Sequence, residues 1–231
     1  MNHRIYLDNA ATTQMSEAVK QEMEPYLLQD FGNASTAYSY GEEAKTAIEH
    51  ARKIIAESLE AKPGEIYFTS GGSESDNWAI KCIAGERKGR GKHIITSSIE
   101  HHAILNSCAY LEELGYEVTY LNVDENGMVS PEEVRRAIRQ DTTLISVMFG
   151  NNEVGTIEPI MQIGRIAREN GVLFHTDAVQ AYAQVPISVR VCPIDLLSAS
   201  AHKFHGPKGT GFLYIREGIE IPSFIHGGSQ E

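Results

Sequence analysis

The chain has 231 residues, enough for one large domain with a substantial hydrophobic core. Its composition, 42% hydrophobic and 22% charged, is that of an ordinary globular protein, and the formal net charge is −11 with no segment rich in Lys and Arg. These values argue against nucleic acid and anionic membranes as partners.

The sequence carries no sign of secretion or membrane insertion. Residues 1–8 contain no long apolar segment, so we expect no signal peptide, and no stretch approaches the roughly 20 apolar residues of a membrane helix. The three cysteines, Cys82, Cys108 and Cys192, are an odd number without CxxC spacing. They predict neither a disulfide framework nor a zinc cluster, and we expect no metal site and a reducing, cytoplasmic location.

Helical and strand patterns alternate along the chain. The predicted helices cover residues 16–28, 40–59, 73–87, 102–114, 131–139 and 160–170, the fifth with Ser130 as its N-cap. The predicted strands cover residues 65–69, 93–97, 117–122, 143–149, 172–176, 194–198 and 211–215. This alternation predicts an α/β domain with a mostly parallel, seven-stranded sheet and helices on both faces. Such a sheet binds ligands at the carboxyl ends of its strands.

A glycine pair, Gly71 and Gly72, joins the first predicted strand to a helix. Glycine lets the backbone approach a ligand closely, and the free N–H groups of a helix start favour an anion. The segment is therefore a candidate phosphate cradle, although it fits neither the Walker nor the GxGxxG pattern. A tight structural turn is the alternative.

Two further polar segments follow strands. Ser98–His102 contains His101, a candidate acid–base group, although a histidine in this position is more often structural. Phe149–Gly155 contains Asn151-Asn152-Glu153, whose polar side chains need partners at a buried strand end. The alternative for this second segment is a plain turn.

Asp177 closes the nearly apolar strand 172–176. A buried carboxylate requires a cation or several hydrogen-bond donors, and a protonated ring nitrogen on a cofactor would supply the cation. The equally weighted alternative is that Asp177 caps a short helix beginning at Ala178.

Lys203 follows the strand 194–198 and precedes a glycine-rich turn, with His202 and His205 beside it. A desolvated lysine near other cationic groups is a nucleophilic amine that can form a Schiff base. A solvated surface lysine is the alternative. A lysine, an aspartate for a pyridinium nitrogen and a phosphate cradle are together the three fixtures that pyridoxal 5'-phosphate needs, with His101 available to lie on its ring.

The motifs that carry these groups resemble those of the NifS/IscS-type cysteine desulfurases, in the class V aminotransferase family of fold-type I pyridoxal phosphate enzymes. They occur in the family's order. The matching segments are Tyr6–Thr13, Phe68–Asn77, Glu100–Ala103, Asn151–Gly155, His175–Gln180 and Ser200–Gly211.

The resemblance implies a role for each matched residue. Lys203 forms the Schiff base and His101 stacks on the ring and moves protons, so these two are the predicted catalytic residues. Asp177 pairs with the ring nitrogen and Gln180 with the ring oxygen. The phosphate is held by Gly72, Ser73, Ser200 and His202. Asn152 contacts both cofactor and substrate, and Asn33 is a second substrate-binding candidate.

The implied activity is release of sulfur from L-cysteine as a protein persulfide, with L-alanine as the other product. The sulfur then passes to an acceptor protein, for iron–sulfur clusters or other uses. The family is homodimeric. Family members continue beyond residue 231 into a small domain that holds the nucleophilic cysteine and the arginine for the substrate carboxylate. We therefore expect residues 16–231 to form a large domain and residues 1–15 to belong with the small domain or the rim of the active site.

Two features leave alternatives open. Ala34 follows Asn33 where the family has proline, and Tyr38 stands where a His or Arg is usual. Without the nucleophilic loop we expect little or no turnover by these residues alone. A class V aminotransferase, a selenocysteine lyase relative and an inactive cofactor-binding scaffold are the competing interpretations.

Overall fold

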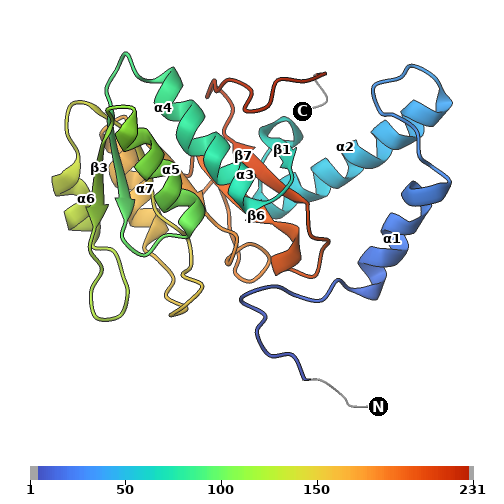
Figure 1. The fold of residues 1–231 in the computed structure, drawn as a ribbon, viewed down its shortest axis with the longest axis horizontal. Coiled ribbons are helices and arrows are strands. Elements are labelled where there is room, and N and C mark those ends of the chain that lie inside the picture. The colour runs from blue at the N-terminus through green and yellow to red at the C-terminus, as the bar shows by residue number, and fades with distance from the viewer. Residues whose placement is uncertain (1–4, 229–231) are drawn as a thin grey trace.

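A seven-stranded sheet forms the centre of the computed structural model, which describes residues 5–228 (Figure 1). The strands are β1 Ile66–Thr69, β2 His93–Ser97, β3 Glu117–Leu121, β4 Thr142–Ser146, β5 Leu173–Asp177, β6 Leu196–Ser200 and β7 Gly211–Ile215. They lie in the order β1-β7-β6-β5-β4-β2-β3, and β7 runs antiparallel to both of its neighbours while the other pairings are parallel. The predicted mostly parallel, seven-stranded sheet is confirmed.

The described residues form helices, and all of these except α1 pack on the two faces of this sheet. The helices are α1 Glu17–Leu28, α2 Ser39–Leu59, α3 Gly72–Asn77, α4 Ile83–Glu86, α5 His102–Glu113, α6 Pro131–Ala137 and α7 Ile160–Glu169. Buried residues of α4, α5 and the π-helical turn Trp78–Cys82 form one hydrophobic core, and buried residues of α2, α6 and α7 form the other. The chain therefore builds a three-layer α/β domain.

Successive side chains of each strand point alternately into the two cores. Ile94 and Leu144 join the core beneath α5, whereas Ile95 and Ile145 join the core beneath α7. Because successive side chains of a strand point to opposite faces, strands buried on both sides read as nearly continuous apolar runs. No helix in residues 5–228 is long and apolar enough to cross a bilayer.

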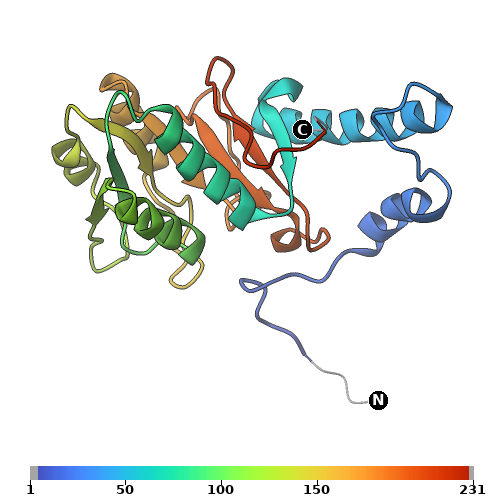
Figure 2. The same ribbon diagram turned by 45° about the horizontal axis from the view of Figure 1, so that its top comes forward.

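The first two helices form an arm at one end of the molecule. α2 packs against the sheet through its last turns, where Ala56 and Leu59 are fully buried, and its first turns extend away from the strands (Figure 2). α1 buries no residue and exposes Leu27 and Leu28 by 69% and 77%. Packing within the chain thus leaves Leu27 and Leu28 of α1 exposed to solvent.

Several predicted elements need correction. The helix predicted over 73–87 is continuous but contains a π-helical turn, Trp78–Cys82, between α3 and α4. β6 begins two residues later than predicted and includes Ser200, because its ladder with β7 extends to the pair of Ser200 and Gly211. The Ser130 side chain does not cap α6. Ala178 begins a series of turns rather than a helix.

Candidate active site

A cavity of about 470 Å³ opens at the carboxyl edge of the sheet. The segments after β2 and β4 diverge at this edge because α5 covers one face of the sheet and α7 the other, and ligands bind at such a switch point. All nine residues predicted to bind the cofactor line this cavity: Gly72, Ser73, His101, Asn152, Asp177, Gln180, Ser200, His202 and Lys203.

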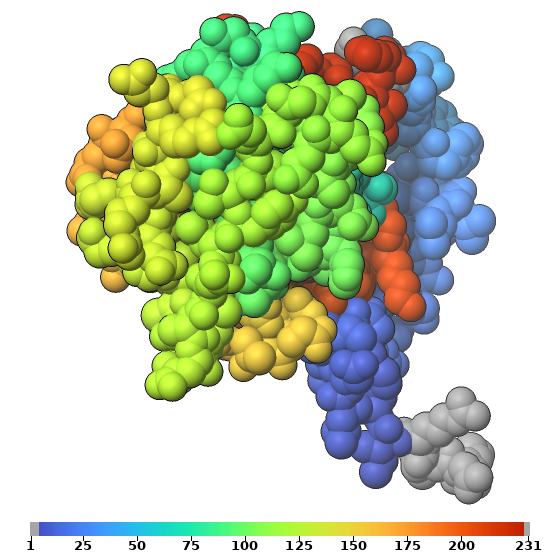
Figure 3. Space-filling view, turned by 60° about the vertical axis from the view of Figure 1, so that its left-hand side comes forward, coloured from blue at the N-terminus to red at the C-terminus, as the bar shows by residue number. Residues whose placement is uncertain are grey.

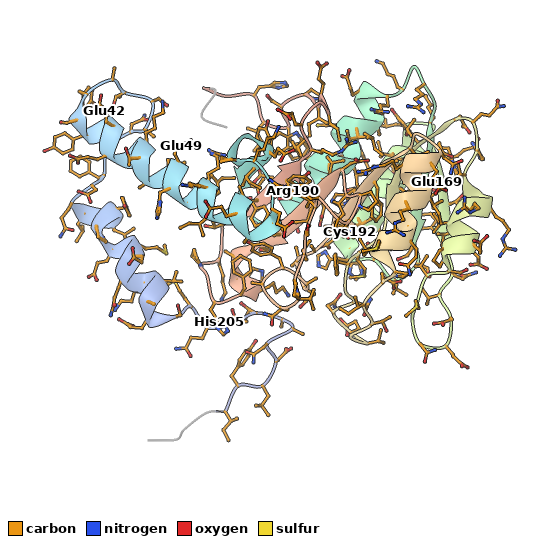
Figure 4. All side chains as sticks on the ribbon, turned by 180° about the vertical axis from the view of Figure 1, so that it is seen from behind. Glu42, Glu49, Glu169, Arg190, Cys192 and His205 are labelled. Atoms are coloured by element: carbon orange, nitrogen blue, oxygen red, sulfur yellow. The ribbon has the colours of Figure 1, made fainter. Side chains whose placement is uncertain are left out.

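The segment before α1 closes one side of the cavity. Asp8, Ala10 and Ala11 are among the lining residues, and Figure 3 shows this segment projecting beside the loop that follows β4. It is attached to the turn after β6, since the Thr13 N–H donates to the His202 carbonyl at 2.8 Å. Figure 4 marks the same junction at His205, whose N–H donates to Thr13 Oγ1 at 2.7 Å. The described part of this segment, residues 5–15, thus borders the cavity through Asp8, Ala10 and Ala11, and residues 1–4 lie outside the described part of the chain.

Lys203 enters the cavity from a short 3-10 turn, Ala201–Lys203, directly after β6. Its Nζ donates to the carbonyl oxygens of Ala10 and Ala11, the latter at 3.0 Å. Burial lowers the pKa of the ammonium, and the carboxylates of Asp177 and Asp8 oppose that shift. Partial desolvation makes the neutral, nucleophilic amine more accessible than on a surface lysine.

Asp177 ends β5 on the same cavity and is 4% exposed. Its Oδ1 accepts the Val179 N–H at 2.9 Å, so it forms the local bond of a capping residue although no helix follows. Burial raises the pKa of this carboxyl, while His101 and Lys203 lower it. The two groups central to the prediction, Lys203 and Asp177, therefore share one cavity and interact electrostatically.

The glycine turn before α3 is shaped for close approach. Gly71 has φ 151°, and a Cβ on Gly72 would lie 2.6 Å from Val179 Cγ2. A side chain at Gly72, the first residue of α3, would therefore press against Val179 in the turn after β5. A second cavity of about 390 Å³ is lined by Gly72, Ser73, Ser200, His202 and also Lys208. N–H groups, hydroxyls and basic side chains suit an anion there.

His101 lies at the start of α5, where its Nδ1 accepts the Ala103 N–H at 3.1 Å. In the neutral ring this bond places the proton on Nε2. One carboxyl oxygen of Asp76, one carboxyl oxygen of Asp177 and one ring nitrogen of His101 all lie within 4.8 Å of one another. His101 is thus both a helix cap and a lining group of the cavity, so its structural and functional interpretations are compatible.

The two asparagines after β4 differ. Asn151 is buried and satisfied within its turn, since its Oδ1 accepts the N–H groups of Glu153 and Val154 and its Nδ2 donates to the Ile99 carbonyl. Asn152 lines the cavity. Asn33 does not line it; its Oδ1 accepts the Ser35 N–H in the exposed loop between α1 and α2. Its substrate role stays a prediction.

The structure adds lining residues to which the sequence assigned no role, among them Asp8, Asp76, Met148 and Glu153. A signal for Asp76 exists in the helical spacing. Asp76, Ile80 and Ile83 recur at the period of a helix and are all buried, so a carboxyl interrupts an apolar stripe. A carboxyl group in that position has to find a partner or remain protonated.

The three cysteines are free and lie away from the cavity lining. Cys108 is fully buried, and burial raises its pKa to about 12. Burial also raises the pKa of Cys82 and of Cys192, which Figure 4 shows beside Arg190 rather than near the junction at His205. A reactive thiol needs exposure and a lowered pKa, so none of the three has the properties of a nucleophile.

The lining residues fit pyridoxal 5'-phosphate. Lys203 offers a partly desolvated amine, and Asp177 lacks a cationic partner at hydrogen-bond distance among the described residues. The turn at Gly72 leaves room for a phosphate beside Ser200 and His202. Those are the attachment points that this cofactor requires.

Comparison with known proteins agrees with this site. The class V aminotransferase family model matches residues 5–230, and the chain belongs to that family. It is 60% identical over 230 residues to the cysteine desulfurase IscS of Methanosarcina thermophila, and 51% identical over 228 residues to the putative cysteine desulfurase IscS 1 of Bacillus subtilis. The chain spans 57% and 60% of the lengths of these two relatives.

Solved structures also resemble this chain in fold and in sequence. A structure described as SspA in complex with cysteine superposes with a TM-score of 0.96 at 46% identity, covering 98% of this chain and 66% of that one. A NifS-like protein superposes with a TM-score of 0.96 at 43% identity, covering 99% of this chain and 63% of that one. The seven-stranded fold is therefore that of the NifS-like cysteine desulfurases, as the sequence predicted.

Proposed function

We propose that the chain is the cofactor-binding part of a pyridoxal 5'-phosphate-dependent cysteine desulfurase, which removes sulfur from L-cysteine and leaves L-alanine. The observation that carries the proposal is the placement of Lys203 and Asp177 on one cavity beside the turn at Gly72. The 60% identity to a desulfurase and the likeness to a structure described as a complex with cysteine support the choice of substrate.

The bound cofactor would act as an electron sink for the substrate carbon atoms. Lys203 would hold it covalently through Nζ, which burial already disposes toward the neutral amine. Asp177 would keep the ring nitrogen protonated through the carboxylate oxygen that Val179 does not bind. The phosphate would lie at Gly72, Ser73, Ser200 and His202, and Gln180 would contact the ring oxygen.

His101 would stack on the ring and transfer protons at Nε2, because its Nδ1 is held by the Ala103 N–H. Asn152, which also lines the cavity, would help to hold the substrate carboxylate. Asn33 would contact the substrate only if the α1–α2 loop of one chain approached the cavity of a second chain in a dimer.

The acceptor of the sulfur would come from outside these 231 residues. The sequence has three cysteines, and none lines the cavity or has a lowered pKa. We therefore propose that the persulfide forms on a thiol elsewhere in a longer chain, and that residues 1–231 alone turn over slowly or not at all. A sulfur-acceptor protein would receive the sulfur afterwards.

Two coarser features complete the proposal. The chain would act as a homodimer, in line with the uncovered apolar side of α1, where Leu27 and Leu28 face solvent. It would work in a reducing, cytoplasmic compartment, which suits three unpaired cysteines.

The direct test adds the cofactor to purified protein and records the visible absorbance band of a lysine-bound cofactor. We expect the band in the wild type and in the control Lys53→Ala, an exposed lysine of α2, and its absence in Lys203→Ala. No band at saturating cofactor would contradict cofactor binding. Sulfide release from cysteine with a reductant then separates the substrate proposal from an inactive scaffold: a full-length relative should release it rapidly, and this chain at a small fraction of that rate.

A further inference from the structure

Asp76 is the lining residue that the proposed function does not use. It belongs to α3 and is 1% exposed, and its Oδ1 has no hydrogen-bond partner among the described residues. Leaving a buried carboxyl oxygen unpartnered is costly, and a charged one more so. A group kept in this state beside a cavity calls for an explanation.

The groups around Asp76 come from β5 and from the segment that precedes α5. Asp177 and His175 belong to β5, while Glu100 and His101 lie before α5. An oxygen of Asp76 lies within 4.8 Å of both a carboxyl oxygen of Asp177 and a ring nitrogen of His101, and its Oδ1 is 3.7 Å from His175 Nε2. The site thus brings Asp76, Asp177 and Glu100 together as three buried carboxyls.

The groups near these carboxyls favour a charge on one of them, Asp177. Lys203 and His101 both stabilise the charge on Asp177, and the Val179 N–H binds it. His175 offers Asp76 no such support: it is fully buried between Ser146 and Ser198, and burial lowers its pKa to about 3, so it is neutral. Burial and the charges of Asp177 and Glu100 hold the pKa of Asp76 well above its usual range, although a hydrogen bond with Ser198 opposes the shift.

We propose that Asp76 is a positioning residue that stays protonated beneath the cofactor site and donates a hydrogen bond to the Asp177 carboxylate. The two side chains have carboxyl oxygens within 4.8 Å of one another, so this hydrogen bond requires a closer approach of the two groups. The pair would then carry one negative charge, aimed at the cationic ring nitrogen, in a site where two adjacent carboxylates repel one another. This inference rests on the proposed cofactor, and it assigns to Asp76 a role that acts through Asp177.

The consequence is a pH dependence of cofactor affinity. As pH falls, Asp177 becomes protonated and loses its attraction for the ring nitrogen. A donor to the Asp177 carboxylate stabilises the anion, lowers its pKa and moves this acid limb to lower pH. Removing the donor should move the limb up by about one pH unit, equivalent to about tenfold weaker binding within the limb.

The first experiment measures the cofactor dissociation constant by absorbance from pH 5 to 9. Asp76→Asn keeps a neutral donor, so its profile should match the wild type within about threefold. Asp76→Leu fills the space without a donor and should show the shifted acid limb, with near-wild-type affinity at high pH. The control Glu158→Gln alters another buried carboxyl, which does not line the cavity, and should change nothing.

Two outcomes would overturn the proposal. Asp76→Asn binding as poorly as Asp177→Asn would mean that Asp76 is an anion. Asp76→Leu with a wild-type profile, or with equal weakening at every pH, would mean that no donor acts on Asp177. If the wild type binds no cofactor at any pH, the proposed function fails, and a second measurement on the cofactor-free protein decides the protonation of Asp76.

That measurement is the free energy of unfolding of cofactor-free Asp76→Asn relative to the wild type, by urea denaturation from pH 5 to 8. A carboxyl whose folded pKa is raised loses stability as pH rises through that window, and Asn does not. The variant should therefore gain relative stability with pH, and gain less in an Asp177→Asn background. A difference independent of pH would contradict a protonated Asp76.

Discussion

Two buried aspartates on neighbouring strands make an instructive pair. Asp195 lies just before β6 at the amino edge of the sheet and is 5% exposed, whereas Asp177 ends β5 at the carboxyl edge and is 4% exposed. Asp195 accepts the Phe174 N–H at 2.8 Å and the guanidinium of Arg216 at 2.6 and 2.7 Å. Asp177 accepts a hydrogen bond from the Val179 N–H, and residues 5–228 place no cation at a comparable distance from it.

The difference separates a carboxylate that is paired within the fold from one for which we propose a function. At the amino edge the chain supplies its own cation, which completes a closed ion pair. At the carboxyl edge the chain leaves the same chemical group facing a cavity, where a cationic ligand can complete it. Burial alone would not distinguish the two residues; the origin of the positive charge does.

The sharpest way to test this comparison is to neutralise each aspartate in turn. Asp177→Asn should weaken cofactor binding about 100-fold or more, because a buried charge pair loses one partner. Its cofactor-free stability should not fall, since a buried carboxylate with a raised pKa is removed. Absorbance titration and urea denaturation measure the two effects.

Asp195→Asn should give the opposite pattern. Cofactor affinity should stay within about threefold of the wild type, while the free energy of unfolding falls by about 2 kcal/mol because Arg216 loses its counter-ion. The side chain of Arg216 is 41% exposed, so solvent offsets part of the loss. Equal loss of cofactor affinity in both variants would remove the distinction between the two edges.

The glycine turn offers a smaller, steric test at the carboxyl edge. Gly72→Ala would place a Cβ 2.6 Å from Val179 Cγ2, so α3 or the turn after Asp177 has to move. We expect cofactor binding about tenfold weaker, with a loss of stability of about 1 kcal/mol from overpacking. The companion Gly85→Ala, where a Cβ meets nothing within 4 Å, should bind normally; equal effects in both would argue against a close approach at Gly72.

The weakest expected effect concerns His175 beneath the cavity. Because burial lowers its pKa to about 3, the folded protein binds fewer protons than the unfolded chain between about pH 6.5 and 3, and stability is lost as pH falls through that window. His175→Asn should flatten the acid side of the stability curve in cofactor-free protein. A curve of unchanged slope would mean that the imidazole is protonated in the fold.

Much of this architecture is readable in the sequence. The sequence predicts the bounds of β2 and β7, residues 93–97 and 211–215, without error, because both segments are rich in β-branched or aromatic residues. The errors fall where tertiary contacts decide the ends of elements. Ser200 joins β6 because Gly211 pairs with it, and no local pattern encodes that pairing.

The site divides in the same way. Residues in recognisable motifs, such as Lys203 and Asp177, could be named from the sequence, since their chemistry is unusual next to apolar strands. Asp76 could not be given a role, because its significance lies in its distance from Asp177, 101 residues further along the chain. The rim at Ala10 and Ala11 contributes backbone carbonyls, which no side-chain pattern reveals.

The central claim is that Lys203 carries the cofactor with Asp177 as its counter-charge. Borohydride reduction of the cofactor-loaded protein fixes the lysine–cofactor link as a stable amine, and peptide mass spectrometry locates it. The account predicts a single modified lysine, Lys203, with modification strongly reduced in Asp177→Asn at limiting cofactor. Modification of another lysine in place of Lys203, or none, would contradict it.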